Sequence, residues 1–248
     1  QSSANVGITV LSANAGYQHL CKTKKASWGF DYGYTDLSLA FALIKQRQDF
    51  SKVPTYHNLD ANFRIKTSKT GMLKYYGYFS SNRLAFTTNS IDTLGYLDKF
   101  AIGNKNHYHN LSWKENLPKR WKISIGASYS NNEDEIHASL QDNNKTEVVL
   151  GGLEFKNFSL DNRGNYVNAK TVLEKKMKGL SALRFGAEYN FSNDKVVYTA
   201  YDGQKYPSGL KQHIKSLFAE ADVYATNDLA VKAGMRFEHS SVLEKTNI

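Results

Sequence analysis

The sequence predicts an all-β protein: an antiparallel up-and-down transmembrane β-barrel, to which this chain contributes about ten strands. Three observations lead to this prediction. Apolar and polar residues alternate at period two in segments of about nine residues. The connections between these segments are alternately short and long along the chain. No apolar run reaches the 18 residues that a membrane helix needs. The mean hydropathy of −0.53 is compatible with a barrel, because only every second strand residue meets lipid.

The strands are recognised by their alternation. The clearest is 121–129 (WKISIGASY), whose odd-numbered positions are apolar or aromatic and whose even-numbered positions are small or polar. Several segments have the roughly 9–11 residues that a tilted strand needs to cross a bilayer. The predicted strands are 6–19, 26–34, 57–66, 72–82, 100–113, 121–129, 165–173, 183–191, 217–225 and 229–237.

The connections fall into two classes. Short ones are predicted near 20–25, 69–71, 117–120, 178–179 and 226–228, and long ones near 37–56, 83–98, 133–162 and 193–210. Short periplasmic turns and long external loops are typical of outer-membrane barrels. We expect Gly71 to supply a positive φ in its tight turn. Residues 37–44 (LSLAFALI) are predicted to extend the preceding strand rather than to form a short helix.

The predicted strand directions also bear on the ends of the chain. With the short turns in the periplasm, the first predicted strand starts outside and the last ends outside. Closure is what hides strand edges from lipid. We therefore expect residues 1–248 to be one segment from the middle of a longer barrel. Residues 240–248 are expected to lead into another strand.

Composition excludes several functions. The net charge of +9 is spread over all strands and turns, without the compact basic patch of a nucleic-acid-binding protein. The single cysteine excludes an internal disulfide framework. The sequence has no nucleophile–base set, phosphate-binding loop or dinucleotide fingerprint, so it predicts neither an enzyme nor a cofactor. The aromatic content of 13 %, with 16 tyrosines, suits a membrane interface.

Several groups of charged or metal-ligating residues are candidates for binding metal ions, lipid headgroups or the contents of the lumen. His107 and His109 share one face of a strand and could grip a metal, but no third ligand has a fixed spacing, so no metal site is predicted. Clustered carboxylates in the predicted loops are interpreted as solvated charge: Glu133, Asp134, Glu135, Asp194 and Asp202. Basic residues gather at the short turns, where long stems can reach lipid headgroups: Lys22, Lys24, Lys25, Lys69, Lys119, Arg120, Lys175, Lys176 and Lys178. Charged residues on the polar face are predicted to line the lumen: Arg64, Lys66, Arg184, Glu188, Lys232, Arg236 and Glu238.

The strand sequences 66–76 (KTSKTGMLKYY), 179–189 (GLSALRFGAEY) and 229–238 (LAVKAGMRFE) resemble barrel strands of TonB-dependent outer-membrane receptors, particularly the Bacteroidetes type. The resemblance covers most of the chain. It implies a 22-stranded barrel in the bacterial outer membrane, occluded by a plug domain of the same full-length chain. It also implies import of a nutrient with energy from TonB, and a surface lipoprotein as a further partner. Neither a plug nor a TonB box is visible in this sequence.

Ligand contact is predicted for aromatic residues in the long loops, because their faces can stack on sugars and flat molecules: Phe50, Tyr56, Tyr201 and Tyr206. Two alternatives stay open at this point. One is an outer-membrane barrel outside the TonB-dependent family, a porin or a surface adhesin. The other is a soluble β-sandwich or lipocalin-like binding protein, which would need to bury its apolar face in a core.

Overall fold

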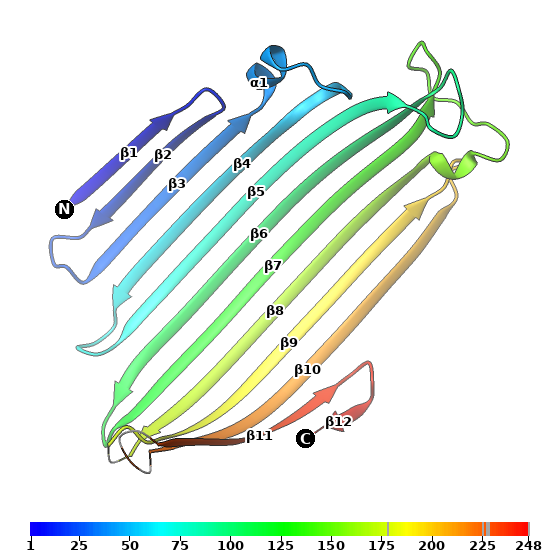
Figure 1. Ribbon diagram of the computed structural model, residues 1–248. Helices are drawn as coiled ribbons and strands as arrows, with labels where there is room; N and C mark the ends of the chain where they lie inside the picture. The colour runs from blue at the N-terminus through cyan, green and yellow to red at the C-terminus, as the bar shows by residue number, and fades with distance from the viewer. Residues whose placement is uncertain (178, 225, 227–228, 248) are drawn as a thin grey trace.

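The computed structural model describes residues 1–177, 179–224, 226 and 229–247, and within them the chain forms one antiparallel sheet in which each strand pairs with the next. Figure 1 shows this meander. The twelve strands of the described part are β1 (Ser2–Ile8), β2 (Ser12–Leu20), β3 (Ala26–Asp36), β4 (Asp49–Lys66), β5 (Met72–Asn89), β6 (Leu97–Leu117), β7 (Trp121–Gln141), β8 (Phe158–Lys176), β9 (Ala182–Thr199), β10 (Lys205–Tyr224), β11 (Ala230–Ser240) and β12 (Lys245–Asn247). Two short helices lie in the connections, α1 (Ser38–Leu43) and the 3₁₀ turn η1 (Glu154–Lys156).

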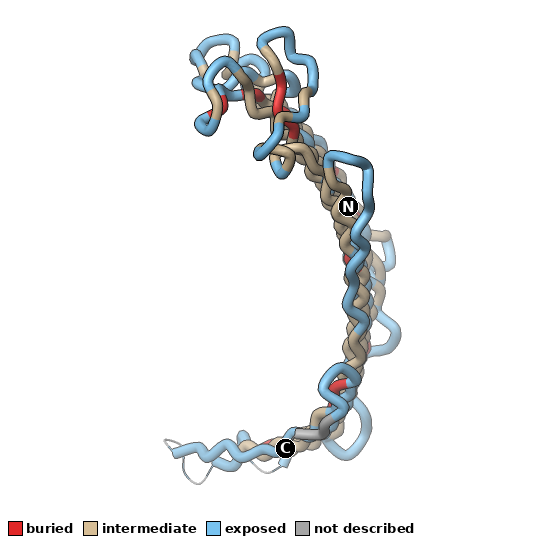
Figure 2. Tube along the Cα trace, turned by 90° about the vertical axis from the view of Figure 1, so that its right-hand side faces the viewer, coloured by how far each residue is buried: buried red, intermediate tan, exposed pale blue. Residues whose placement is uncertain are grey.

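The sheet is a single bent layer. Figure 2 shows it from the edge as an arc, and no second layer covers either face of the strands. Within the described residues β1 and β12 are not paired, so the sheet is open. The accessible surface is 16318 Å². A compact soluble monomer of 28.0 kDa would expose only about 11,000 Å², so this sheet leaves surface uncovered that a soluble fold would bury.

The two faces differ in chemistry. We call the face that carries Trp28, Leu59, Ile125 and Phe185 the lipid face, and the opposite face the lumen face. Large apolar side chains on the lipid face stay exposed, 38 % for Trp28 and 46 % for Phe185. Three hydrophobic residues in the described part are buried, and only Leu140 among them is fully buried: Ala85, Leu140 and Ala182. The soluble alternative needs a core on this face, and the structure has none.

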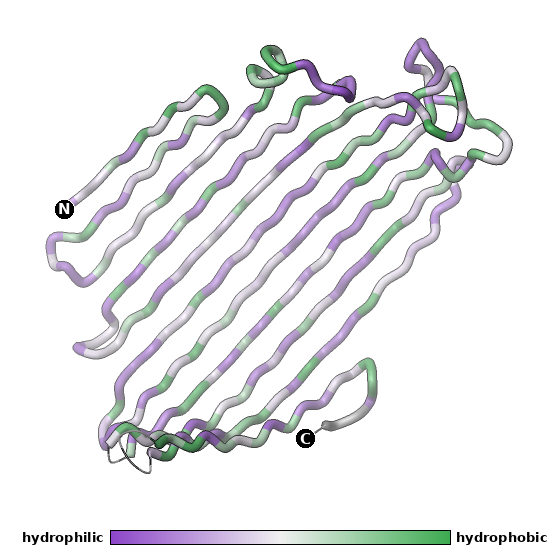
Figure 3. Tube along the Cα trace, in the orientation of Figure 1, coloured by the Kyte–Doolittle hydropathy of each residue, from purple (hydrophilic) through white to green (hydrophobic). Residues whose placement is uncertain are grey.

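The strand registers place the apolar band at the short-turn end. Figure 3 shows the alternating hydropathy along each strand. Opposite Ile125 on the lipid face stand Trp113 of β6 and Thr171 of β8, and on β9 Phe185 pairs with Leu173. From the short turns, each long strand keeps this pattern for about nine to eleven residues. That is the length that a tilted strand needs to cross a bilayer.

The short turns gather at one end of the sheet, as predicted, with their basic side chains. Lys175 places its Nζ atom 5.1 Å from the Trp121 ring, and Arg120 donates to the carbonyl oxygen of Met177 at 3.1 Å. Lys119 and Arg120 both have left-handed backbone, with φ of 57° and 64°. Residue 178 and most of the turn predicted at 226–228 lie outside the described residues.

The first predicted strand is wrong. Residues 6–19 form parts of two strands, because the chain reverses between β1 and β2. The Thr9 hydroxyl accepts hydrogen bonds from the backbone N–H groups of Leu11 (3.2 Å) and Ser12 (3.0 Å) and thereby holds a tight turn. The β1 strand consequently starts at the short-turn end rather than at the loop end, so the expected outside start is incorrect.

Two further local predictions are wrong. Residues 38–43 form α1 instead of extending β3, which ends at Asp36; the Asp36 carboxylate accepts a hydrogen bond from the Ser38 N–H at 2.8 Å. Gly71 does not have a positive φ. Its turn is held instead by the Ser68 hydroxyl, which accepts hydrogen bonds from the N–H groups of Thr70 and Gly71. The expected continuation near the end of the chain is present as β12, which pairs with β11.

Candidate ligand-binding surface

The long strands continue far beyond the apolar band, and there the alternation inverts. On β7 the lipid-face positions change from Ile125 to Glu133 and Glu135, while the lumen-face positions change from Ser124 to Ile136. A face that turns from apolar to charged has left the membrane. The upper part of each long strand is therefore a wall outside the bilayer, with its apolar side turned inward.

This inversion corrects the predicted long loops. Residues 83–98 and 193–210 consist mainly of strand, and 133–162 is strand at both ends; the actual connections are 90–96, 142–157 and 200–204. The carboxylates predicted to be solvated in loops lie accordingly in strands. Asp134 on the lumen face accepts hydrogen bonds from Asn104 and, at 3.2 Å, from Asn162. Asp194 accepts one from Tyr166. Only Asp202 lies in a turn, where it accepts from the Gln204 N–H at 2.9 Å.

An aromatic stripe crosses the lumen face near its loop end. We use this name for seven rings from α1 and six strands: Phe41, Phe50, Phe86, Phe100, Phe158, Tyr198 and Tyr206. Successive ring centroids are 4.8 Å (Phe41–Phe50), 5.7 Å (Phe50–Phe86), 5.9 Å (Phe86–Phe100), 5.7 Å (Phe158–Tyr198) and 6.1 Å (Tyr198–Tyr206) apart. These separations are those of packed aromatic pairs.

The aromatic stripe is interrupted at its centre by a small side chain. Ala138 of β7 lies between its two halves, because Ala138 pairs in register with Phe100 on one side and with Phe158 on the other. A row of aliphatic side chains borders the stripe on its membrane side: Leu84, Ile102, Ile136 and Leu160, which are opposite one another from β5 to β8. The rings are half-buried or, in Tyr206, 50 % exposed. Their faces can therefore contact a molecule in the space beside the inward side of this wall, above the membrane, which we call the vestibule.

A row of hydrogen-bonding side chains runs next to the aliphatic row, closer to the membrane. Asn82 donates to Asn104 at 3.5 Å, and Asn106 donates to Ser80 at 3.2 Å and to Asn104 at 2.5 Å. Together with the Asp134 bonds this row links β5 to β8. An apolar, aromatic surface beside a row of amides can bind a molecule that has both flat apolar faces and hydroxyl or amide groups.

The four residues predicted to contact ligand are only partly brought together. Phe50 and Tyr206 belong to the aromatic stripe, but both lie in strands, β4 and β10, and not in loops. Tyr56 also lies in β4, opposite Asn82, and is 43 % exposed. Tyr201 lies in the 200–204 turn as expected and is 52 % exposed.

Sequence reasoning missed five members of the stripe. These are Phe41, Phe86, Phe100, Phe158 and Tyr198. The available signal was the inversion itself: in 99–105 the bulky apolar residues, Phe100 and Ile102, occupy even positions, whereas in 107–113 the odd positions face lipid. A continued period of two with exchanged faces predicts a strand that leaves the membrane.

The connection 142–157 is fixed over the loop end by ion pairs. Lys156, whose side chain is only 10 % exposed, lies 2.7 Å from Asp92, 2.9 Å from Asp98 and 2.8 Å from the Ser90 hydroxyl. Burial acts to lower the pKa of Lys156, but its hydrogen bonds and its attraction to the two aspartates outweigh this and raise the pKa. Lys156 is thereby held charged, and it ties the 142–157 connection to 90–96.

A second contact fixes the same connection. Glu147 accepts hydrogen bonds from Lys99 (3.1 Å) and Ser139 (3.1 Å) and lies 3.2 Å from His137. Burial acts to raise the pKa of Glu147, but these hydrogen bonds and the Lys99 charge leave it lowered. Asn157 completes the attachment, because its side chain accepts from the Leu140 N–H at 2.6 Å.

The histidine pair lies on the face of the sheet away from the lumen. His107 and His109 both lie on the lipid face of β6, and His109 is 2.8 Å from the Tyr75 hydroxyl. Among the described residues no group of three or more His, Cys, Asp or Glu side chains could hold a metal ion. None of the helices in the described residues has the length and apolar character that a membrane span requires.

Part of the charged set predicted to line the lumen forms two clusters of ion pairs, which we together call the charged network. Arg184 contacts Glu174 at 2.8 Å and Asp222 at 2.5 Å across β8 to β10. Glu188 lies 3.3 Å from both Lys170 and Arg236. This network covers the lumen face over β8 to β11, at the level of the apolar band on the opposite face. Arg64 and Lys66 lie on the lumen face of β4, away from it.

Comparisons with known proteins agree with this architecture. A family model described as "TonB dependent receptor-like, beta-barrel" matches residues 27–247. Among solved structures, the ferric yersiniabactin uptake receptor FyuA from Yersinia pestis is similar, with a TM-score of 0.58 and 9 % identity. The match covers 96 % of this chain and 45 % of that receptor, so the chain spans less than half of the receptor's length. At this identity the likeness shows the fold. No curated protein matches.

Proposed function

The chain belongs to the TonB-dependent receptor family as part of its β-barrel, and from this premise we propose that it forms the ligand-binding wall of an energised nutrient importer. Membership places the barrel in the outer membrane of Gram-negative bacteria, and it decides against the porin and adhesin alternative. The family is one of receptors and transporters, and we propose that this chain has no enzymatic activity.

The observation that carries the proposal is the aromatic stripe above the membrane. The stripe lies on the inward side of the wall, next to a row of amides, where a ligand from outside would arrive before reaching the lumen. We propose that Phe50, Tyr56 and Tyr206 contact ligand from the strands and Tyr201 from its turn. The fixed connection 142–157 would cover this vestibule.

We further propose the partners that the family implies. Residues 1–248 would form one uninterrupted segment of barrel wall around a plug domain of the full-length receptor, which TonB would displace. The charged network on the lumen face, with Arg184 and Glu188 at its centres, would face that plug. The Bacteroidetes type and a surface lipoprotein partner stay predictions from the strand sequences.

The experiment has two stages in the source bacterium. Deleting the gene and screening growth on single nutrients identifies the imported ligand, and deletion of tonB must abolish the same growth. Growth that persists without TonB would refute energised import. In the second stage, uptake is measured with two variants of the full-length receptor. The test variant carries Phe100→Ala together with Phe158→Ala, and the control variant carries Phe30→Ala on the lipid face. We expect uptake to fall at least tenfold in the double variant and not in the control, at equal surface levels.

Loss of two stacking contacts supports this magnitude, since each aromatic contact contributes about 0.5–1.5 kcal/mol beyond its buried area. Normal uptake by the double variant, with TonB dependence intact, would overturn the stripe as binding surface and leave the transport assignment standing. The two claims therefore fail separately.

A further inference from the structure

A groove lies on the lipid face across β7 to β11, where the assigned function needs none. Its volume is about 670 Å³. The registers resolve its lining into two neighbouring rows, one from Ile125 to Thr171, Ala187, Leu217 and Phe237, the other from Ala127 to Ala169, Tyr189, Lys215 and His239. Three alanines form the floor between bulkier neighbours. A depression in the lipid face has the right chemistry for an acyl chain.

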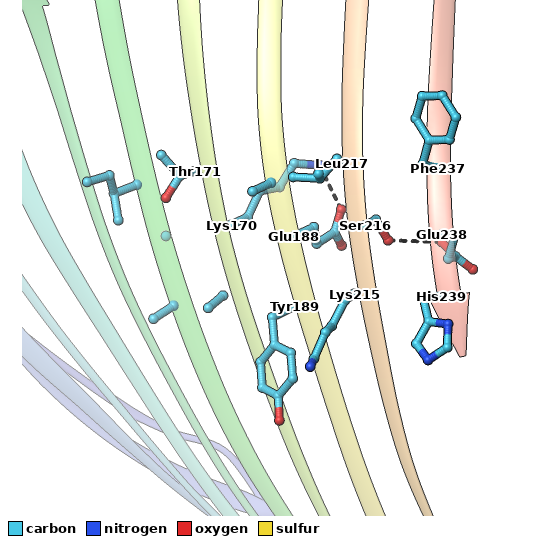
Figure 4. A pocket seen from close by; sticks show the side chains of 15 residues that line it. Lys170, Thr171, Glu188, Tyr189, Lys215, Ser216, Leu217, Phe237, Glu238 and His239 are labelled. Atoms are coloured by element: carbon cyan, nitrogen blue, oxygen red, sulfur yellow. Dashed lines mark hydrogen bonds and ion pairs between the residues drawn. The ribbon is translucent and has the colours of Figure 1, made fainter. Parts of the chain in front are cut away.

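One end of the groove is polar. Figure 4 shows Tyr189, Lys215 and His239 together at one end, and Leu217 and Phe237 at the other. The polar end points toward the loops, because β10 runs from the loop end to the turn end and Lys215 precedes Leu217. The Tyr189 hydroxyl lies 2.8 Å from Nδ1 of His213, one position further in the same direction on the lipid face. The groove thus ends at the outer boundary of the membrane.

Beyond this end, further lysines continue along the lipid face. Lys211 follows on β10, with its Nζ atom 5.8 Å from the centre of the Phe191 ring, and Lys195 follows on β9. In the part of the chain that the structure describes, Lys195, Lys211 and Lys215 have no carboxylate within 4.0 Å, whereas Lys170, Lys232 and other lysines do. Unpaired lysines at a membrane surface attract anionic headgroups.

The charge is separated between the two faces. On β9 to β11 the described carboxylates lie on the lumen face: Glu188, Asp194, Glu220, Asp222 and Glu238. On the lipid face of these three strands the basic side chains are lysines and histidines, and no described residue there is a carboxylate. The lipid-face carboxylates nearest in register are Asp161 of β8, which pairs with Val197 of β9, and Glu133 of β7, which pairs with Arg163 of β8. A ligand at the end of the groove therefore meets positive charge on β9 and β10.

We propose that this groove is a specific site for an anionic, phosphate-bearing lipid of the outer leaflet. An acyl chain lies over Ala127, Ala169 and Ala187, and the phosphate lies between Lys211 and Lys215, with Lys195 further toward the loops. Apolar contact and charge act at the two ends of one molecule, and neither alone accounts for both ends of the groove. The site is independent of the imported ligand, because it faces away from the lumen.

The test uses the full-length receptor, purified from the membrane and reconstituted in nanodiscs of phosphatidylcholine. Native mass spectrometry then measures retention of added diphosphoryl lipid A, phosphatidylglycerol or phosphatidylcholine. We expect the two phosphate-bearing anionic lipids to be retained and zwitterionic phosphatidylcholine to be lost. Lys211→Gln with Lys215→Gln should weaken retention at least tenfold, since each such lysine contributes about 1 kcal/mol.

Two variants make the result specific. Lys105→Gln removes a lipid-face lysine on β6, far from the groove, and should leave retention unchanged. Ala187→Trp fills the groove floor from a lipid-exposed position and should reduce retention of acylated ligands while the receptor keeps its heat-modifiable mobility. Equal retention in all variants would overturn the proposal. Displacement of the lipids by millimolar inorganic phosphate would also overturn it, because it would mean a phosphate site without a lipid chain.

Discussion

The assignment of the two faces makes a quantitative prediction at Leu111. Leu111 lies on the lipid face of β6, pairs with Tyr75 and Ala127, and is 47 % exposed. Six residues separate it from Leu117 at the short-turn end. At about 3.3 Å per residue and a tilt of about 45°, Leu111 lies about 14 Å above that end. The apolar band of a barrel is about 25 Å tall, so Leu111 is close to the midplane.

Leu111→Arg should therefore destabilise the barrel by about 2–4 kcal/mol, the cost of an arginine in the lipid at midplane depth. Asn110→Arg is the matched control, one position away on the lumen face, where Asn110 pairs with Tyr76 and Ser128. We expect it to cost less than about 1 kcal/mol. The assay is guanidinium unfolding of the full-length receptor in vesicles, followed by the mobility shift on heating. Equal destabilisation by both variants, or a larger loss for Asn110→Arg, would refute the face assignment.

Three further predictions concern the connections. Lys156→Met leaves two carboxylates unpaired and should cost about 1–3 kcal/mol of local stability, measured as faster protease cleavage of 142–157 in intact cells. The pKa of Glu147 is lowered, so Glu147 stabilises the folded connection above the ordinary glutamate pKa near 4.5, and this contribution is lost as the pH falls through the lowered pKa. Protease cleavage of 142–157 should therefore accelerate in that pH range in the unmodified receptor and not in Glu147→Gln. At Arg120, with φ of 64°, glycine should be more stable than valine by about 1–2 kcal/mol in the unfolding assay, and no difference would contradict the left-handed turn.

The strand boundaries show where sequence reasoning reaches its limit. The predicted end of the strand at 129 is where β7 approaches the outer boundary, and the observed strand continues to Gln141. Alternation persists beyond 131, but the apolar residues move to the opposite face, as in Glu135 and Ile136. A loss of apolar residues on one face reads as a loop when the other face is not considered. The same error placed Phe50 and Tyr206 in loops.

Local turn chemistry explains the remaining errors. The hairpin between β1 and β2 contains no glycine or proline, and a threonine hydroxyl holds it. Its sequence, 9–12 (TVLS), has no conventional turn signal. Gly71 was expected to be needed for its φ, whereas the serine at 68 satisfies the turn without it. Such hydroxyl contacts depend on side-chain placement, which residue type alone does not fix.

The sequence by itself determined the fold class, the membrane-facing residues and the short-turn end, because period-two alternation follows directly from strand geometry. It also determined that lysine and arginine concentrate at the turns. Only the tertiary structure decided which residues meet across strands. The aromatic stripe brings together residues from Phe41 to Tyr206, and the lipid-face groove brings together residues from Ala127 to Phe237. In each case the residues at the two ends are more than a hundred positions apart in the sequence. Such assemblies depend on register, and register is set by pairing along the whole sheet.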